Sequence, residues 1–233
     1  CEIDPKDSIV FISLEPCTHQ GRTPPCIEAL IKAKVSAVFF SSMDPNPKVS
    51  GKSVDILNAA GIEVSHGLLS DQSDELNIGF FHRMRFKKPF VRSKIGSSID
   101  GKIALSNGES KWITSDDSRY DVQKLRAESC AIMTSNQTVL ADDASLNVRI
   151  DDFYDDDQPL RIVVDSSRKC SGNEKIFQLP GETMIHSERV NQSLFEHLGS
   201  MEINNVLVES GPRMNGALLE SDLIDELIIY MSP

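Results

Sequence analysis

The sequence predicts an α/β protein with two domains, because short apolar strands alternate with amphipathic helices along most of the chain. Its 233 residues are enough for two compact domains. The basic segment RFKKP, residues 85–89, shows no periodicity, ends in proline and separates two alternating series. We therefore expect one domain over residues 1–85 and a second over residues 90–233.

The first domain is predicted to begin with a buried strand, SIVFISL (residues 8–14), which leads into a polar loop with two cysteines. Apolar residues at helical spacing follow, and VSAVFFSS (residues 35–42) reads as the next strand. A helix at 53–60, a strand at 62–67 and a polar helical stretch at 70–84 continue the alternation. This order favours a mostly parallel sheet with helices on both faces.

The second domain repeats the alternation. Strands are predicted near residues 90–99, 131–134, 160–164, 183–186, 205–210 and 225–231, and helices near 115–127, 191–198 and 214–220. Asp100-Gly101 is expected to make a tight turn that brings Lys94 and Ser98 to a cleft. The acidic segment DDFYDDD carries too much like charge to pack and is interpreted as a solvated loop.

Composition narrows the class of partner. A net charge of −11 argues against binding nucleic acid through its phosphates, and no apolar run is long enough to span a membrane, so a small-molecule substrate is expected. Five irregularly spaced cysteines favour a reducing, cytoplasmic setting. The chain begins at Cys1 without an initiator Met and ends directly after a predicted strand, so we expect it to be part of a longer polypeptide.

The loop EPCTHQGRTPPC contains the strongest candidate metal ligands, Cys17 and Cys26. A catalytic zinc ion needs three protein ligands and an open position for water, and these two thiols supply two of the three. Cys26 is predicted to open a helix, whose N-terminal N–H groups favour a thiolate. The alternative is a pair of buried free cysteines. Eight residues separate the two cysteines, whereas the general deaminase signature separates its pair by two.

A family resemblance adds to this interpretation. The stretches LEPCTHQGRTPPC, DPNPKVSGKS and GIEVSHGLL resemble the deaminase half of the bifunctional riboflavin biosynthesis deaminase-reductases. The stretches SKIGSSIDGKIA, GESKWIT, LRAESCAIMTSNQTVLADDASLNVR, RIVVDS and VESGPRMNGALL are similar to the reductase half, in the same order. The resemblance covers nearly the whole chain. It implies a partial cytidine deaminase-like three-layer domain that holds Zn²⁺, followed by a dihydrofolate reductase-like α/β domain that uses NADPH and lacks its C-terminal part.

In that family the third zinc ligand and the proton-carrying glutamate come from an upstream His-x-Glu, and none precedes Cys17 here. The loop therefore holds half a zinc site. Three interpretations of His19 stay open: a replacement ligand, a substrate contact or a solvated loop histidine. The resemblance implies that Asp44 and Asn46 contact a pyrimidine edge, whereas their residue types alone indicate a turn.

The segment ESGPRMNGALL is the clearest candidate for a dinucleotide turn, because it follows a strand and opens a helix with free N–H groups. It is neither G-x-G-x-x-G nor a Walker loop, and alone it also fits a tight strand-to-helix connection. With the resemblance, the cofactor is expected at Gly211, Pro212, Arg213, Met214, Asn215, Gly216 and Ala217.

The resemblance also implies a pyrimidine ribosyl phosphate substrate and a hydride transfer to the first carbon of its opened ribose. The implied substrate contacts are Ser110, Arg126, Leu146, Arg149 and Glu209, and the implied cofactor contacts are Gly96, Trp112, Thr138, Asp142 and Ser166. Alone, Arg126 reads as a solvated helix-face residue and Trp112 as core. Lys94 and Glu209 are candidates for protonating or orienting the substrate.

Two other functions are alternatives to the bifunctional enzyme. Without His-x-Glu, the first domain can be a catalytically inactive scaffold for the reductase, and stoichiometric zinc would distinguish the two. A nucleic-acid-editing deaminase is disfavoured by the acidic charge and the second domain. The family also implies a homo-oligomer formed through the reductase sheets.

Overall fold

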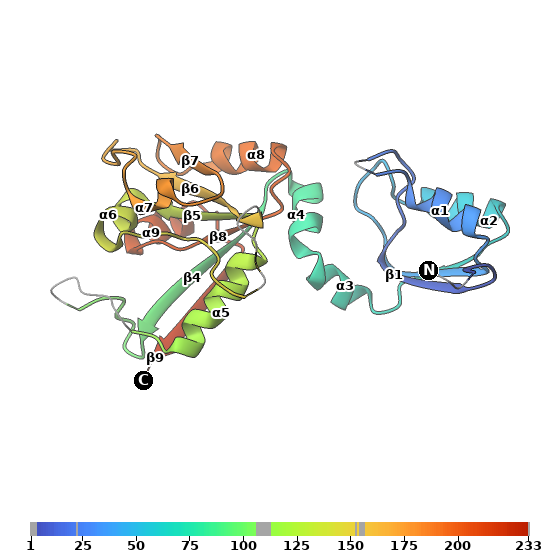
Figure 1. Ribbon diagram of the computed structural model, residues 1–233, viewed down its shortest axis with the longest axis horizontal. Helices are drawn as coiled ribbons and strands as arrows, with labels where there is room; N and C mark the ends of the chain where they lie inside the picture. Colours follow the sequence, from blue (N-terminus) through green and yellow to red (C-terminus); the bar gives the residue numbers. More distant parts are fainter. Residues whose placement is uncertain (1–3, 22, 106–112, 152, 154–156, 233) are drawn as a thin grey trace. The chain divides into compact units, whose positions relative to one another are not determined.

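The computed structural model describes residues 4–21, 23–105, 113–151, 153 and 157–232. The chain divides into two compact units, Cys1–Arg85 and Phe86–Pro233 (Figure 1). Each unit has its own parallel sheet. In the described part of the chain, no helix combines the length and the apolar character that crossing a membrane requires.

The first unit contains a three-stranded parallel sheet in the order β1 (Ile9–Leu14), β2 (Ala37–Ser42), β3 (Glu63–His66). The helices α1 (Cys26–Ala33) and α2 (Lys52–Ala59) lie on one face of it (Figure 1). Their side chains form a core with alternate residues of the strands, namely Val10, Ile12, Val38 and Val64 together with Ile27, Leu30 and Leu57. The predicted strand and helix order of this unit is confirmed.

The polar stretch predicted as one helix forms two, α3 (Ser70–Leu76) and α4 (Ile78–Phe86). Between them, Asn77 has φ −109° and ψ 21°, and both its backbone N–H and its side-chain amide donate to the Ser73 carbonyl oxygen, at 3.1 and 2.9 Å. The helix α4 continues to Phe86, so the first two residues of the segment 85–89 are helical, and the two compact units divide after Arg85.

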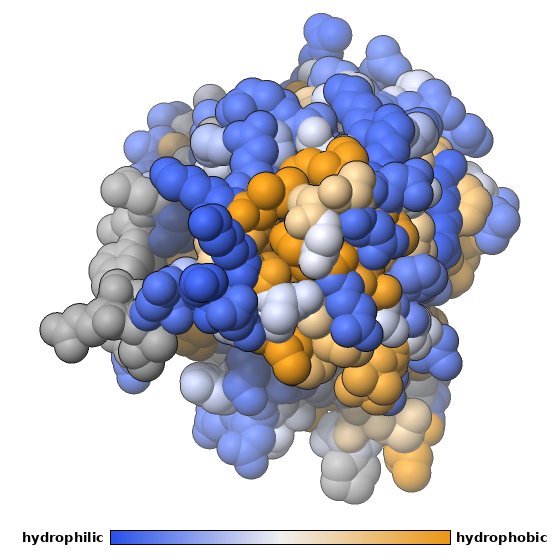
Figure 2. Space-filling view, turned by 90° about the vertical axis from the view of Figure 1, so that its right-hand side faces the viewer, coloured by the Kyte–Doolittle hydropathy of each residue, from blue (hydrophilic) through white to orange (hydrophobic). Residues whose placement is uncertain are grey.

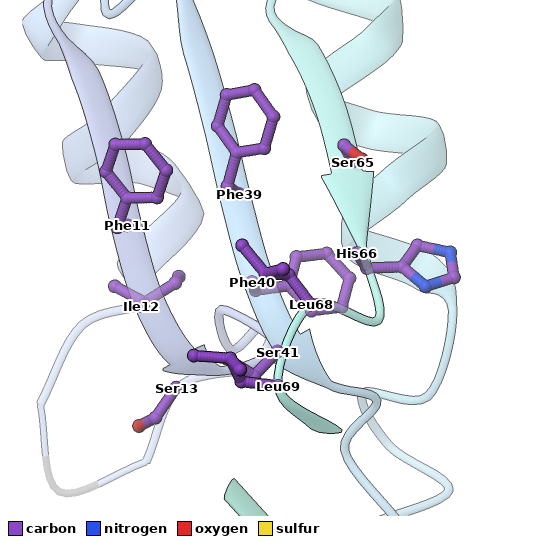
Figure 3. A pocket seen from close by; sticks show the side chains of 10 residues that line it. All are labelled: Phe11, Ile12, Ser13, Phe39, Phe40, Ser41, Ser65, His66, Leu68 and Leu69. Carbon is purple, nitrogen blue, oxygen red and sulfur yellow. The ribbon is translucent and has the colours of Figure 1, made fainter. Parts of the chain in front are cut away.

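The second face of this sheet is not covered by α1 and α2. Phe11 and Phe39 stack on it with ring centroids 5.1 Å apart, and Phe11 is 68% exposed (Figure 3). Both residues line a hollow of about 300 Å³ with Leu68 and Leu69. Hydrophobic surface ringed by hydrophilic surface is visible in Figure 2. Helices therefore cover one face of this sheet, α3 contacts β1 and β2, and the second face exposes Phe11.

The second unit contains a six-stranded sheet in the order β7-β6-β5-β8-β4-β9, and every neighbouring pair is parallel. The predicted strands are confirmed, with the bounds β4 (Phe90–Ser98), β5 (Ala131–Ser135), β6 (Leu160–Val164), β7 (Thr183–His186), β8 (Asn205–Val208) and β9 (Glu226–Ser232). Because all strands are parallel, their carboxyl ends meet at one edge of the sheet.

Helices cover both faces of this sheet. The helices α8 (Gln192–Ser200) and α9 (Pro212–Glu220) pack on the face that includes Ala131 and Met133. The intervening Ile132 points to the other face, into a core with α6 (Asn136–Asp142) and α7 (Lys175–Gln178). The helix α5 (Asp116–Ala127) runs between β4 and β5 in the chain. The sequence patterns predicted α5, α8 and α9, but neither α6 nor α7.

The order of the strands creates a switch point between β5 and β8. The strand β5 continues through α6 to β6 on one side, whereas β8 continues through α9 to β9 on the opposite side. Ligands of open parallel α/β sheets bind at the carboxyl ends of the strands where the connections diverge in this way. The candidate site is therefore expected next to the carboxyl ends of β5 and β8.

Candidate active site at the carboxyl edge of the second sheet

A buried ion cluster occupies this edge. Glu209 follows β8 and is 7% exposed. Arg126 of α5 donates from Nε to Glu209 Oε1 at 2.5 Å and from a terminal nitrogen to Oε2 at 3.1 Å. Lys94 of β4 places Nζ 2.9 Å from the same Oε2. Arg126 is itself 8% exposed, so the alternative that it is a solvated helix-face residue is wrong.

The two cations decide the protonation state of Glu209. Burial alone would raise the pKa of Glu209, but the charges of Arg126 and Lys94 lower it to about 2. The carboxylate is therefore ionised at neutral pH and satisfies both cations. Backbone bonds fix its position, because the Glu209 N–H donates to Met133 O at 2.9 Å and Thr134 Oγ1 donates to Glu209 O at 2.7 Å.

A third cation lies beside this cluster. Arg149 and Arg126 both donate to the carbonyl oxygen of Asn147, at 3.4 and 3.1 Å. Burial and the nearby Arg126 charge lower the pKa of Arg149, while Glu209 opposes this effect. Lys94, Arg126 and Arg149 carry three positive charges against the single charge of Glu209. The four groups are therefore suited to an anionic ligand.

The loop that carries Arg149 is held in an unusual conformation. Leu146 has φ 51° in the left-handed region, although it is not a glycine. Its side chain is 4% exposed and packs in the core between the sheet and α6, so only its backbone can face a ligand. Left-handed non-glycine residues are costly and cluster at functional sites.

The turn from β8 into α9 has free donors and free space. Gly211 is the N-cap residue of α9 and has no side chain, so no capping side chain accepts hydrogen bonds from the N–H groups of the first turn. A Cβ atom at Gly211 or at Gly216 would meet no other atom within 4 Å. The Ser210 hydroxyl is buried without a hydrogen-bond partner among the described residues. This donor set and this space fit a dinucleotide phosphate group.

The side chains of the α9 turn point in different directions. Met214 packs in the core, and Asn215 bonds to Ser93 Oγ and to the Ser210 carbonyl oxygen, both at 2.9 Å. Pro212, Arg213 and Ala217 are exposed. Met214 and Asn215 can therefore meet a cofactor only through their backbone.

The other residues expected at the cofactor lie on several elements. Gly96 lies on β4, where a Cβ would come within 3.3 Å of Thr114. Thr138 and Asp142 lie at the two ends of α6, and the Thr138 hydroxyl is 3.2 Å from that of Ser135, the N-cap residue. Ser166 is exposed after β6. Ser110 and Trp112 lie outside the described residues.

Two residues that the sequence did not single out support this edge. Asp165, directly after β6, is 2% exposed, and Asn136, the first residue of α6, donates to it at 2.6 Å. Burial would raise the pKa of Asp165, but bonds from Lys169 N, Cys170 N and Asn136 lower it. The aspartate in RIVVDS was a possible signal, because a buried strand ends directly before it.

The cysteine loop of the first unit brings Cys17 and Cys26 together, with the Cys26 N–H donating to Cys17 Sγ at 3.2 Å. Cys26 opens α1 as predicted, but its pKa is raised by the hydrogen bond with Cys17, by burial and by the Cys17 charge. In the metal-free loop, the neighbouring Cys17 sulfur therefore acts against the thiolate that the helix terminus is expected to favour.

Within the described part of the chain, no third metal ligand joins the two cysteines. Among the described residues, no group of three His, Cys, Asp or Glu side chains is arranged to hold a metal ion, and His19 does not join the two cysteines in such a group. A His-Ser-Glu sequence does occur at residues 186–188, but it begins at the end of β7 in the second unit. The described residues therefore do not form a zinc site.

The polar loops of the first unit are organised around Glu15. This buried carboxylate accepts from the N–H groups of Asp44, Gly51 and Ser53 and from the Ser53 hydroxyl, at 2.7–3.3 Å. Asp44 and Asn46 each accept from a backbone N–H two residues ahead, as turn residues do. Burial raises the pKa of Asp44. These bonds do not exclude a ligand contact by the remaining polar atoms.

Comparison with known proteins gives this architecture a family. The family model described as the RibD C-terminal domain matches residues 89–233. The riboflavin biosynthesis protein RibD of Escherichia coli is 44% identical, over 98% of this chain and 71% of that protein. The RibD of Haemophilus influenzae is 40% identical over 98% of this chain and 69% of that protein.

Solved structures of RibD proteins also match this chain. RibD of Acinetobacter baumannii, form 1, matches with a TM-score of 0.88 and 40% identity, over 95% of this chain and 67% of that chain. A Thermotoga maritima protein described as a diaminohydroxyphosphoribosylaminopyrimidine deaminase/5-amino-6-(5-phosphoribosylamino)uracil reductase matches with a TM-score of 0.85 and 30% identity, over 94% and 66% of the two chains.

The fold of the second unit is that of an α/β reductase domain, here preceded by a smaller α/β unit. The chain belongs to the RibD family and carries the reductase of riboflavin biosynthesis. The resemblance to the bifunctional deaminase-reductases is thereby confirmed at the level of the family.

Proposed function

We propose that the second unit, residues 90–233, reduces 5-amino-6-(5-phosphoribosylamino)uracil to the ribitylamino product with NADPH. The cluster of Lys94, Arg126 and Glu209 beside the switch point of the sheet is the observation that carries this proposal. The name of the Thermotoga maritima relative includes the same reductase activity, which supports the choice of substrate.

The chain offers a fitting place for the cofactor. The uncapped first turn of α9, the open space at Gly211 and Gly216 and the unpartnered Ser210 hydroxyl would hold the pyrophosphate. NADPH, when bound, supplies the hydride for the reduction. The protein supplies binding, orientation and a proton.

The cations would hold the anionic substrate. A terminal nitrogen of Arg149 donates to Ser145 Oγ at 3.1 Å and to Asn147 Oδ1 at 2.9 Å, and both acceptors belong to its own loop. These hydrogen bonds keep the guanidinium in place. A bound phosphate would receive charge-assisted hydrogen bonds from it. Arg126 is held by Glu209 and would add positive potential rather than a free donor.

The roles of Lys94 and Glu209 differ. Reduction of the opened ribosylamino group adds a hydride to the first sugar carbon and a proton to the attached nitrogen. Glu209 cannot donate that proton, because its pKa near 2 leaves it ionised at neutral pH. The Lys94 ammonium carries protons, and Glu209 holds it at 2.9 Å. Lys94 is therefore the proposed proton donor, and Glu209 orients it.

Substitution tests these roles. Lys94→Met and Glu209→Gln should each lower kcat for substrate-dependent NADPH oxidation by at least about a hundredfold, the lower end of the range for losing a positioned acid–base group. Lys124→Gln removes a charge from the exposed part of α5 and should leave turnover unchanged. Turnover of both variants at the level of the Lys124→Gln control would refute the proposal.

We further propose that residues 1–85 are the zinc-dependent deaminase domain of the family, in which Cys17 and Cys26 are metal ligands and His19, Asp44 and Asn46 contact the substrate. The two thiols among the described residues do not complete a catalytic zinc site, which needs three ligands, so we derive no catalytic step from a metal.

The alternative is a reductase with a catalytically inactive deaminase-like scaffold. In the metal-free loop, the hydrogen bond with Cys17 raises the pKa of Cys26, which is compatible with this alternative. Metal analysis of the purified chain distinguishes the two. One zinc per chain that is lost in Cys26→Ser supports the deaminase domain, whereas a zinc-free chain that still oxidises NADPH supports the scaffold.

A further inference from the structure

The loop after β6 is held rigidly by a buried carboxylate. Asp165 accepts from the N–H groups of Lys169 and Cys170 at 3.0 and 2.9 Å, and the Arg168 N–H donates to the Asp165 carbonyl oxygen at 3.0 Å. Asn136 Nδ2 bonds to both Asp165 Oδ1 and Ser167 Oγ, at 2.6 and 2.7 Å. These bonds tie the loop to the start of α6, which follows β5 at the switch point.

The same bonds leave two cations facing solvent. Arg168 and Lys169 are exposed, and neither side chain forms an ion pair with another described residue. Arg168 has φ 52°, a left-handed conformation that is uncommon outside glycine. Ser166, also exposed, adds a hydroxyl to the same loop. The loop thus presents two exposed cations and a hydroxyl on a hydrogen-bonded backbone, in a chain of net charge −11.

The strand order puts this loop within reach of a dinucleotide. From β4, which carries Lys94, the sheet continues through β8 and β5 to β6. Neighbouring strands lie about 4.8 Å apart, so three spacings place the end of β6 roughly 14 Å from β4. A dinucleotide with its nicotinamide near Lys94 and its pyrophosphate at α9 would therefore place its adenosine ribose near the loop after β6.

The chemistry of the loop discriminates between two cofactors. In NAD sites an acidic residue accepts a hydrogen bond from the ribose 2′-hydroxyl, whereas NADP sites place a cation near the 2′-phosphate. The acid at this strand end, Asp165, is 2% exposed, and the loop N–H groups and Asn136 occupy both of its oxygens. A bound ribose would meet Arg168 and Lys169 instead.

We propose that Arg168 and Lys169 bind the 2′-phosphate of the dinucleotide, and that Asp165 and Asn136 position them, so that this chain selects NADPH over NADH. This inference rests on the proposed reductase function, because it assumes that the nicotinamide lies near Lys94. It adds the residues that determine cofactor specificity.

Calorimetric titration of the whole chain with adenosine 2′,5′-bisphosphate and with adenosine 5′-monophosphate tests this proposal without turnover. The Arg168→Gln/Lys169→Gln variant should bind the bisphosphate at least about tenfold more weakly, as expected for lost charge-assisted hydrogen bonds, and the monophosphate within about twofold of the parent. Lys124→Gln, which removes one positive charge from the exposed part of α5, should change neither affinity. In turnover, the double variant should raise the KM for NADPH and leave that for NADH unchanged.

The outcomes separate this inference from the function on which it rests. If the double variant binds both nucleotides like the parent, or loses both equally, the loop is not the 2′-phosphate site, while intact NADPH oxidation would leave the reductase proposal standing. If the parent chain binds neither nucleotide and oxidises no NADPH, both proposals fail.

Discussion

Glu209 is the residue whose neutralisation tests the ion cluster most sharply. Replacing Glu209 with Gln keeps the shape of the side chain but leaves the charges of Lys94 and Arg126 close together without their carboxylate. Both cations are largely buried, so water compensates poorly for the lost partner. We expect the variant to be less stable as well as less active.

The expected loss of stability follows from the pKa of Glu209. A decrease from the ordinary value of 4.5 to about 2 corresponds to about 3 kcal/mol in favour of the ionised, folded form. Breaking a buried ion pair typically costs about 3–5 kcal/mol, which is of the same size. At neutral pH, Glu209→Gln should therefore lower the free energy of unfolding by about 3 kcal/mol.

The dependence on pH has a definite sign. Because the pKa is lower in the folded protein, the contribution of Glu209 is complete above pH 4.5 and is lost as the pH falls towards about 2. Urea unfolding followed by circular dichroism should show a difference between parent and variant of about 3 kcal/mol at pH 7 and about 1.4 kcal/mol at pH 3.

Glu220→Gln provides the control for this experiment, since it makes the same substitution at an exposed residue that ends α9. It should change the free energy of unfolding by less than about 0.5 kcal/mol. The account of the cluster would be refuted if Glu209→Gln unfolds at the same urea concentration as this control, or if the difference does not shrink on acidification.

Three further predictions concern packing and binding. Gly199→Ala should destabilise the chain by at least about 2 kcal/mol in urea unfolding, because its Cβ would lie 2.2 Å from the Lys87 carbonyl oxygen. Gly216→Ala, whose Cβ would meet no neighbouring atom within 4 Å outside its own helix backbone, should instead stabilise α9 by up to about 1 kcal/mol. Equal effects of the two substitutions on the free energy of unfolding would contradict the packing. Arg149→Ala should raise the KM for the phosphorylated substrate at least about tenfold with a smaller change in kcat, and an unchanged KM in steady-state assays would exclude the phosphate role. Phe40 is 1% exposed, and Phe40→Ala should lower the free energy of unfolding by about 3–5 kcal/mol in the same assay. Phe11 is 68% exposed, and Phe11→Ser should lower it by less than about 1 kcal/mol. If Phe11→Ser destabilised the chain as much as Phe40→Ala, the face bearing Phe11 would be covered.

Local sequence patterns predicted most strands and helices, because the spacing of apolar residues within one continuous segment indicates its secondary structure. The strand β6 has the predicted bounds, since its apolar β-branched residues lie between polar segments. The helix α6 was missed because it is short and mostly polar, and its start depends on the Ser135 cap. The break at Asn77 was missed because a polar side chain can either face solvent or bond to the backbone.

The site depends on contacts that sequence patterns do not contain. Lys94 and Glu209 were singled out from the sequence, but their ion pair exists because β4 and β8 are neighbours in a sheet whose order does not follow the chain. Asn136 and Asp165 were missed because their bond joins residues 29 positions apart. The raised pKa of Cys26 was not predicted for the same reason, because only the folded loop brings the Cys17 sulfur next to Cys26.

The fate of the transferred hydride tests the central claim most directly. The chain would be incubated with 5-amino-6-(5-phosphoribosylamino)uracil and NADPH carrying deuterium at the transferable position, and the product examined by mass spectrometry and NMR. The account predicts one deuterium on the first carbon of a ribitylamino product, formed only with substrate present and greatly reduced in Lys94→Met. Absence of the label from that carbon, or no NADPH consumption by the parent chain, would contradict it.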